Sequence, residues 1–218
     1  MYLLFDLDGT LTEPERGITN SLKYALGKYG IEETDMQKLR SCIGPPLIDA
    51  FENQWGFERE KAVEAVAFYR EYFAEKGIFE NELFDGIAEM LLELKAAGHT
   101  LLVATSKPEE YATRILEHFH ILQYFDSVVG NTLQEERPKK EDVLHYIQFL
   151  YPDISRDNAL MIGDRKYDVE GAKSLSLPCA AVSYGHGSQE ELIAAGADVI
   201  LPTVQALHQY LMSRGENE

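Results

Sequence analysis

The 218-residue sequence has little cysteine, few basic residues and no long apolar run. Its two cysteines, Cys42 and Cys179, lie far apart and match neither a disulfide framework nor the spacing of a metal–thiolate site. No apolar stretch approaches the ~20 residues needed to cross a membrane, and the N-terminus lacks the pattern of a secretory signal. We therefore expect a cytoplasmic protein with no membrane partner.

The charge is one-sided, because 37 acidic residues stand against 20 lysines and arginines and give a formal net charge of −17. A chain of this charge is repelled by nucleic acid and by anionic membrane surfaces over much of its own surface. We therefore expect no nucleic-acid partner, and a small anionic ligand would have to meet a local cation. For the oligomeric state we expect a monomer or a weak homodimer.

Short apolar runs alternate with longer amphipathic stretches along most of the chain. The apolar runs predict buried strands at residues 2–5, 100–105, 127–130, 159–163, 179–183 and 198–201. The stretches at 87–98 and 141–151 carry apolar residues at helical spacing. This alternation predicts an α/β fold, a Rossmann-like parallel sheet with helices on both faces, in which ligands bind beyond the carboxyl ends of the strands.

Residues 15–79 interrupt the alternation, because several helical patterns follow one another there with no strand between them. We therefore expect a core domain of residues 1–14 and 80–218 with an inserted, all-helical cap domain at 15–79. The aromatic stretch AFYREYF at 67–73 lies in this insertion, and its helical spacing is typical of packing inside the cap rather than of a substrate pocket.

Two helix starts are marked by the spacing of a capping box. Thr34 precedes Gln37 by three residues, and Ser188 precedes Glu191 by the same interval. In that motif the N-cap hydroxyl and the later carboxylate or amide each accept a hydrogen bond from a free backbone NH. We therefore expect helices to begin just after Thr34 and just after Ser188.

The first strand ends on two aspartates, Asp6 and Asp8, in the sequence DLDGT. Side chains two residues apart on an extended segment point to the same side, so both carboxylates would face one crevice at the strand end. For these five residues alone, a solvated turn that uses Gly9 is the plainer interpretation. The segment MIGDRKYD favours the crevice, because a second strand ends there on Asp164 and is followed by Asp168.

Four carboxylates at one sheet edge would repel one another unless a divalent cation lies among their oxygens. Oxygen ligands with room for water and a phosphate oxygen favour Mg²⁺. Either Asp164 or Asp168 alone could instead cap the following helix. A third strand end, TSKP, offers the hydroxyls of Thr105 and Ser106 with free backbone NH groups at a helix start, which is typical of an anion site as well as of an ordinary helix start.

Together these three strand ends resemble the motifs of the haloacid dehalogenase superfamily, specifically its phosphatases with a helical cap of the C1 type inserted after the first motif. The resemblance covers essentially the whole chain, and GDRKYDVEGA and YGHGSQEEL are most similar to the phosphoglycolate phosphatase-like branch. It implies a Mg²⁺-dependent phosphatase that hydrolyses a small phosphate monoester, such as phosphoglycolate or a nucleoside monophosphate, through an aspartyl-phosphate. The implied partner is a small phosphorylated metabolite.

The resemblance also implies roles for the residues that match its motifs. Asp6 would be the nucleophile and Asp8 the general acid and base. Magnesium would be held by Asp6, the main-chain carbonyl of Asp8 and Asp164, and Asp168 would complete or orient that set. The groups that would bind the phosphoryl oxygens are the side chains of Thr105 and Ser106, a lysine of the third motif, and the backbone after Asp6 at Leu7 and Asp8.

The third motif, RPKKEDVLHYI, leaves the identity of that lysine open. Lys140, followed by EDVLHY, fits the phosphoglycolate phosphatase-like branch best, Lys139 is the alternative register, and Arg137 is a distant third. A charged residue at a helix start is otherwise usually solvated. Lys107 stands where the branch often has lysine, while Ser106 replaces the more usual asparagine.

A helical cap would exclude water and supply the residues that choose the leaving group. The resemblance implies that the IGPPL turn at 43–47 faces the active site. The candidate substrate residues are Glu13 in the linker, Arg16, Arg40, Gly44, Pro45 and Arg70. His186, between two glycines, is interpreted as a bystander, because the aspartate pair already supplies the proton transfers.

Other functions compete with hydrolysis. A sugar phosphomutase would use the same aspartyl-phosphate but return the phosphoryl group to a sugar. A receiver-type signalling protein also has a phosphorylated aspartate in a parallel sheet, but such proteins have no helical insertion and no use for Asp8. A metal-binding protein whose catalysis has decayed is disfavoured, because Asp6, Asp8, Thr105 and Asp164 are all intact.

Overall fold

The structure, a computed structural model, describes residues 1–215. A parallel sheet of six strands has the order β5-β4-β1-β6-β7-β8. Its strands are β1 (Tyr2–Phe5), β4 (Thr100–Pro108), β5 (Ser127–Asn131), β6 (Ala159–Gly163), β7 (Cys179–Val182) and β8 (Val199–Leu201). The sheet confirms the predicted fold class, and every predicted strand is present within one residue at each end, except that β4 continues to Pro108.

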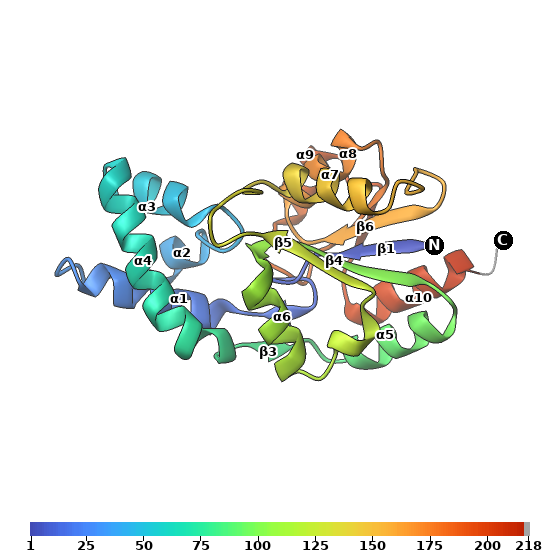
Figure 1. Ribbon diagram of the computed structural model, residues 1–218, viewed down its shortest axis with the longest axis horizontal. Helices are drawn as coiled ribbons and strands as arrows, with labels where there is room; N and C mark the ends of the chain where they lie inside the picture. Colours follow the sequence, from blue (N-terminus) through green and yellow to red (C-terminus); the bar gives the residue numbers. More distant parts are fainter. Residues whose placement is uncertain (216–218) are drawn as a thin grey trace. The chain divides into compact units, whose positions relative to one another are not determined.

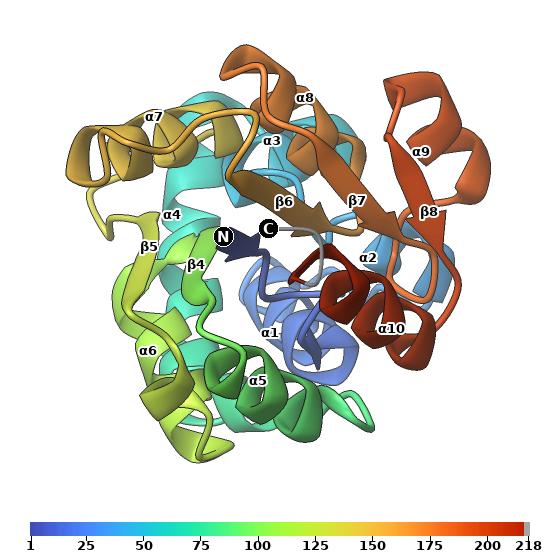
Figure 2. The same ribbon diagram turned by 90° about the vertical axis from the view of Figure 1, so that its right-hand side faces the viewer.

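Helices cover both faces of the sheet, as the alternating pattern predicted (Figure 1, Figure 2). On one face lie α7 (Lys140–Leu150), α8 (Lys166–Ser174) and α9 (Gln189–Ala195). On the other lie α5 (Ile87–Ala96), α6 (Glu109–His118) and α10 (Val204–Gly215). A short 3₁₀ helix, η2 (Leu122–Tyr124), precedes β5. Within residues 1–215, no helix is long and apolar enough to span a membrane.

The core lies between the sheet and these helices. Both faces of the central strand β1 are covered, and Leu3, Leu4 and Phe5 are buried. Leu4 packs with Leu102 and Met161 from the flanking strands. Burial on both faces explains why these strands are continuous apolar runs rather than alternating ones.

The register of β1 brings three strand ends together. Phe5 pairs with Val103 of β4 on one side and with Ile162 of β6 on the other. Asp6 follows Phe5 directly, and Thr105 and Asp164 come two residues after its partners, so all three lie at the same edge of the sheet.

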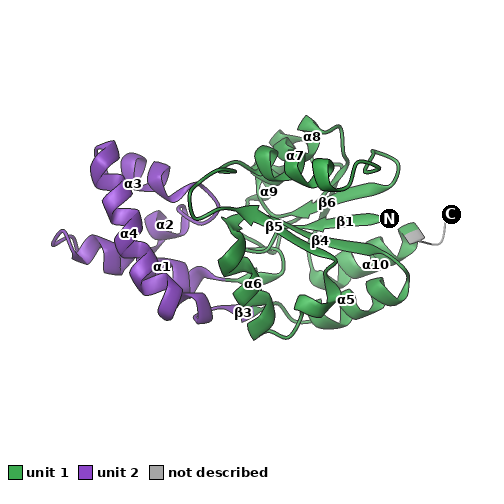
Figure 3. Cartoon of the chain, viewed as in Figure 1, with its two compact units in different colours: residues 1–13, 83–218 green, residues 14–82 purple. Residues whose placement is uncertain are grey.

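The chain divides into two compact units (Figure 3). Unit 1 holds Met1–Glu13 and the chain from Leu83 onward, and it contains the sheet. Unit 2 holds Pro14–Glu82. Two short strands that sequence patterns did not predict, β2 (Thr12–Glu13) and β3 (Glu82–Leu83), pair where the chain passes between the units.

Unit 2 is helical, with α1 (Glu15–Gly27), α2 (Met36–Arg40), α3 (Leu47–Trp55), α4 (Arg59–Glu75) and the 3₁₀ helix η1 (Gly77–Phe79). Aromatic rings supply much of its packing. Tyr69 and Phe73 are buried and stacked, with ring centroids 5.4 Å apart, and Tyr24 packs against Tyr72 at 5.5 Å. The aromatic stretch at 67–73 therefore contributes to the interior of the unit.

The start of α2 corrects one sequence prediction. Asp35, not Thr34, is the N-cap, and its carboxylate accepts hydrogen bonds from the backbone NH groups of Gln37 (2.9 Å) and Lys38 (3.2 Å). The capping box predicted at Thr34 is wrong, because an aspartate one residue later caps better than threonine and also places a negative charge at the positive end of the helix.

Candidate active site

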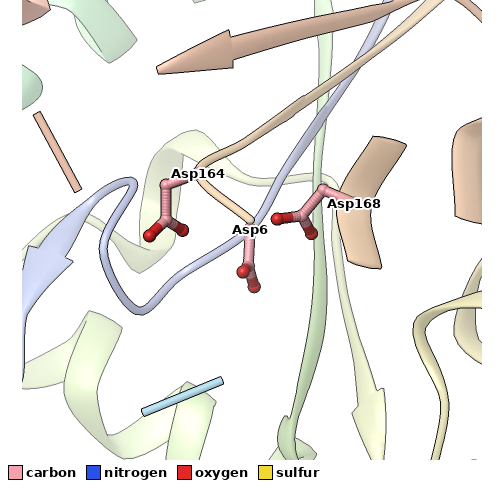
Figure 4. Close-up of side chains that lie close together, drawn as sticks. All are labelled: Asp6, Asp164 and Asp168. Carbon is pink, nitrogen blue, oxygen red and sulfur yellow. The ribbon is translucent and has the colours of Figure 1, made fainter. Parts of the chain in front are cut away.

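Three buried aspartates meet where β1 and β6 end (Figure 4). The backbone NH of Asp6 donates to the carbonyl of Ile162 (2.8 Å), so the β1–β6 ladder continues one residue past the strand and draws Asp6 towards Asp164. Asp168 comes from the first turn of α8. One carboxylate oxygen from each of the three lies within 4.8 Å of the others, and the residues are only 9%, 0% and 1% exposed in sequence order.

This cluster has the chemistry of a divalent cation site. Burial, then the charges of Asp168 and Asp6, raise the pKa of Asp164 to about 8. Burial raises the pKa of Asp168 to about 6, against the opposing effect of Lys140. Burial and neighbouring negative charge both penalise the ionised carboxylates, and a bound cation would offset that penalty. Carboxylate oxygens are the ligands that Mg²⁺ and Mn²⁺ prefer, so the residues fit such a metal.

Lys140 joins two of the aspartates. Its ammonium group lies 2.8 Å from Asp6 Oδ1 and 2.8 Å from Asp168 Oδ1, and it donates to the carbonyl of Ala104 at 2.6 Å. Burial alone would lower the pKa of Lys140, but Asp168 and Asp6 together raise it well above the usual value. Lys140 is therefore a fixed positive charge inside the carboxylate cluster.

The other two candidates for the third motif lie elsewhere. Lys139 is the exposed N-cap of α7. Arg137 pairs with Glu109 (3.3 Å), donates to the carbonyl of Gly130 (2.8 Å) and stacks over the ring of Tyr146. Of the three candidates, Lys140 is the one that contacts the aspartates.

Asp8 is paired with a residue outside the predicted site set. Lys107 Nζ lies 2.8 Å from Asp8 Oδ2, whereas Asp8 Oδ1 is buried with no hydrogen-bond partner among the described residues. Burial raises the pKa of Asp8, and Lys107 opposes that shift. The backbone NH of Lys107 also donates to Thr105 Oγ1 (3.2 Å). The sequence signal for it was its position after the second motif, where the phosphoglycolate phosphatase-like branch often has lysine.

The loop after β7 holds Asp164 from the opposite side. The backbone NH of His186 donates to Asp164 Oδ2 (2.7 Å), and the hydroxyl of Thr10 lies 3.3 Å from Asp164 Oδ1. Gly9 has a φ of 80°, and a Cβ there would collide with the Asp164 carboxylate. A Cβ on Gly185 would collide with the same side chain. Glycine is therefore required where the backbone approaches Asp164 this closely.

His186, interpreted from the sequence as a bystander, contributes its backbone to the site. Its side chain lies 3.3 Å from Glu13, measured from Nε2 to Oε1. Burial alone would lower the pKa of His186, but Glu13, Asp164 and Asp8 raise it. Glu13 therefore gives the His186 ring an ion-pair partner.

The remaining predicted residues have the following positions. Leu7 is buried, and its backbone NH donates to Asp6 Oδ1 (2.8 Å). Thr105 is buried, and Ser106 is half-buried beside it. Unit 1 therefore brings together the predicted residues Asp6, Leu7, Asp8, Thr105, Ser106, Lys140, Asp164 and Asp168, with Glu13 joined to them through His186.

The other predicted substrate residues belong to unit 2. Arg40 pairs with Glu15 at 2.9 Å, and Arg16 is exposed. Gly44, with a φ of 104°, and Pro45 precede α3, and Arg70 is half-buried on α4. The role of these residues in substrate choice stays a prediction.

Comparison with known proteins places the chain in a family. The model of the haloacid dehalogenase-like hydrolase family matches residues 3–182. The chain is 43% identical to a 5′-nucleotidase of Pseudomonas aeruginosa over 97% of this chain and 95% of that one. It is 26% identical to phosphoglycolate phosphatase 1 of the same organism over 94% of this chain and 77% of that one. It is 37% identical to the tyrosine-protein kinase PtkA of Mycobacterium tuberculosis over 91% and 67%.

Solved structures agree with the sequence comparisons. The crystal structure of a predicted phosphatase from Clostridium acetobutylicum superposes with a TM-score of 0.93 at 47% identity, covering 97% of this chain and 98% of that one. The resemblance stated from three short motifs is thus confirmed across nearly the whole length. The chain belongs to the haloacid dehalogenase-like hydrolase family and is an enzyme of its phosphatase kind.

Proposed function

We propose that this protein is a magnesium-dependent phosphatase that hydrolyses a small phosphate monoester through an aspartyl-phosphate on Asp6. The observation that carries the proposal is the ammonium group of Lys140 at 2.8 Å from both Asp6 and Asp168, beside Asp164. A carboxylate repels a phosphate dianion, so a nucleophilic aspartate needs positive charge held against it.

The metal would be held by Asp6, Asp164 and the main-chain carbonyl of Asp8. Both oxygens of Asp168 already have protein partners. Lys140 contacts Oδ1, and the backbone NH of Arg165 donates to Oδ2 (3.0 Å). This favours a role for Asp168 in orienting the metal ligands over direct ligation of the metal. When bound, Mg²⁺ would supply charge neutralisation between the nucleophile and the phosphoryl oxygens.

Hydrolysis would proceed in two displacements. In the first, a carboxylate oxygen of Asp6 forms a bond to phosphorus while the bond from phosphorus to the leaving oxygen breaks, and protonated Asp8 gives its proton to that oxygen. In the second, Asp8 takes a proton from water as the water oxygen attacks phosphorus, and the Asp6–phosphorus bond breaks to release inorganic phosphate. Asp8 Oδ1, which is buried and has no hydrogen-bond partner within residues 1–215, is the oxygen suited to both transfers.

The phosphoryl oxygens would be bound by Lys140, Thr105, Ser106 and backbone NH groups at Leu7 and Asp8. Thr105 Oγ1 accepts a hydrogen bond from the NH of Lys107, which leaves its own hydroxyl proton to donate. The NH of Leu7 and Lys140 both already contact Asp6 Oδ1, so the same donors hold the nucleophile before the substrate arrives.

Nucleoside monophosphates are the first substrates to test, and phosphoglycolate is the second. This order of substrates follows sequence identity, because the chain is 43% identical to the 5′-nucleotidase and 26% identical to the phosphoglycolate phosphatase. Unit 2 would act as the cap and select the leaving group through Arg16, Arg40, Gly44, Pro45 and Arg70, together with Glu13 of unit 1.

The first experiment measures phosphate release from p-nitrophenyl phosphate with and without Mg²⁺. Hydrolysis is expected with the metal, and EDTA is expected to remove nearly all of it, with recovery on adding excess Mg²⁺. A panel of phosphorylated metabolites then ranks substrates by kcat/KM. Full activity in EDTA would contradict the metal requirement, and inactivity towards every ester in the panel would contradict the proposed function.

The role of Asp8 can be tested with leaving groups of different basicity. Asp8→Asn cannot protonate the leaving oxygen, so its loss of kcat/KM is expected to be on the order of 100-fold or more for an alkyl phosphate. The loss should be several-fold smaller for 2,4-dinitrophenyl phosphate, whose phenolate leaves without a proton. Equal losses on the two substrates would assign Asp8 to binding rather than to proton transfer.

A second candidate function is phosphoryl transfer to a protein acceptor. It is supported by the 37% identity to a relative that carries the name of a tyrosine-protein kinase. Transfer and hydrolysis differ in their products, so the two are separated by comparing inorganic phosphate released with substrate consumed. Stoichiometric phosphate supports the phosphatase.

A further inference from the structure

Of the two hydrogen bonds in the capping box predicted at the start of α9, the structure shows the one accepted by the N-cap serine. Ser188 Oγ accepts a hydrogen bond from the backbone NH of Glu191 (3.1 Å), as that motif requires. The carboxylate of Glu191, however, leaves its own helix. Its Oε1 accepts from Arg165 Nε (2.9 Å) and from the backbone NH of Lys166 (2.9 Å).

The two residues that Glu191 binds, Arg165 and Lys166, lie between two aspartates of the site. Arg165 follows Asp164 directly, and Lys166 is the first residue of α8, two positions before Asp168. The NH of Arg165 donates to Asp168 Oδ2 (3.0 Å), and the NH of Lys166 donates to Glu191. Glu191 therefore caps the N-terminus of α8 from a neighbouring helix and supplies negative charge at its positive end.

The same segment holds this turn at a second point. Just before Ser188, the backbone NH of His186 donates to Asp164 Oδ2 (2.7 Å). Gly187 packs so closely on the Asp164 carbonyl that a Cβ there would overlap it. The segment 185–191 thus contacts the Asp164–Asp168 turn at its start through His186 and Gly187, and at its middle through Glu191.

The ion pair between Glu191 and Arg165 is partly shielded from solvent. Its side chain is 24% exposed and that of Arg165 is 15% exposed, so solvent screens the pair less than a surface ion pair. Arg165 and the NH of Lys166 lower the pKa of Glu191 against the opposing effect of burial, so the carboxylate is charged near neutral pH.

We propose that Glu191 is a positioning residue for the metal site, which holds the Arg165–Lys166 turn so that Asp164 and Asp168 are set near Asp6 before a divalent cation binds. Glu191 touches neither the cation nor the substrate in this proposal. The identity of the cation rests on the proposed function, whereas the positioning itself rests on the contacts of Glu191.

The test compares Glu191→Ala and Glu191→Gln with Glu190→Ala as the matched control. Glu190 is an exposed glutamate on the same helix. Mn²⁺ binding to the folded proteins is measured by calorimetry, because Mn²⁺ accepts the same oxygen ligands as Mg²⁺. Glu191→Ala is expected to weaken binding about tenfold. Glu191→Gln keeps an oxygen for the NH of Lys166 and is expected to recover part of the loss, while Glu190→Ala binds as the parent does.

Kinetics provide the second readout. The Mg²⁺ concentration for half-maximal activity should rise in Glu191→Ala, while kcat at saturating Mg²⁺ stays within about twofold of the parent, because the reacting groups are untouched. A lower melting temperature with an unchanged Mn²⁺ dissociation constant would overturn the inference, since Glu191 would then be only structural.

The outcomes separate this inference from the proposed function. A parent that binds Mn²⁺ but hydrolyses no ester contradicts the proposed function, and the Glu191 comparison by calorimetry still decides the inference. A parent that hydrolyses esters, with Glu191→Ala binding Mn²⁺ as tightly as the parent, overturns the inference alone. A parent that binds no divalent cation overturns both.

Discussion

Asp6→Asn is expected to lower kcat on p-nitrophenyl phosphate by at least about a thousandfold at saturating Mg²⁺. The amide has nearly the shape of the carboxylate but is a poor nucleophile, so no aspartyl-phosphate can form. It also removes the negative charge that Lys140 contacts at 2.8 Å. The measurement is steady-state phosphate release, with far-UV circular dichroism to establish that the variant is folded.

Two further observations make this result specific. Asp157→Asn, at an exposed aspartate outside the cluster, is the matched control and should keep the parental rate. Acid-quenched parent should carry a phosphate adduct on the peptide that contains Asp6, and Asp6→Asn should carry none. If Asp6→Asn retains more than a few per cent of the metal-dependent rate, the nucleophile is another residue.

The aspartates could be predicted from the sequence because their positions follow from strand ends. A continuous apolar run that stops at Asp6, and another that stops before Asp164, fix the residues that leave the sheet. In a parallel sheet all these ends face the same edge, so adjacent strands are enough to bring the carboxylates together. The register of β1 with β6, from Tyr2–Ala159 to Phe5–Ile162, supplies that adjacency.

The choice among Arg137, Lys139 and Lys140 could not be made this way. Successive residues at a helix start differ by about 100° in direction, so one residue of uncertainty in the boundary changes which side chain enters the core. The structure ends that uncertainty, because α7 begins at Lys140 with Lys139 as its N-cap. Lys140 then lies against β4, where it reaches the carbonyl of Ala104.

Local sequence patterns could not predict contacts between distant segments of the chain. The pair of Lys107 with Asp8 depends on β4 running on to Pro108, past the apolar run at 100–105 that marked the strand. Glu191 satisfied a local motif in the sequence, yet its carboxylate binds Arg165 and Lys166 in the folded chain. In both cases a buried or half-buried charge takes the partner that tertiary packing offers.

Lys140→Met is expected to have the second largest effect, because it removes both the cation that we propose acts in catalysis and a buried ion-pair partner. The methionine fills a similar volume but leaves the carboxylates of Asp6 and Asp168 without their shared ammonium group. Breaking a buried pair from one side typically costs about 3 to 5 kcal/mol of unfolding free energy. Activity should fall on the order of 100-fold or more, because the variant lacks the positive charge that would stabilise the transferring phosphoryl group.

The exposed neighbour provides the control for this stability prediction. Lys139→Met removes the same charge one residue away, from a position in solvent, and should change the free energy of unfolding by less than about 0.5 kcal/mol. Urea unfolding of the parent and both variants, without metal, gives the comparison. A Lys140→Met variant as stable as Lys139→Met would mean that the buried ion pairs contribute no net stability.

The pH dependence of the stability loss in Lys140→Met identifies the cause of that loss. Lys140 keeps its charge throughout the neutral and mildly acidic range, so a change there must come from the carboxyl groups. The pKa of Asp168, already raised to about 6 in the parent, should rise further without Lys140, so between about pH 6 and that higher value the folded variant keeps a proton that the folded parent has lost. The variant therefore gains stability relative to the parent as pH falls, and unfolding curves should show a smaller deficit at mildly acidic pH than near neutrality. A deficit that is constant with pH would instead attribute the loss to packing around the new methionine.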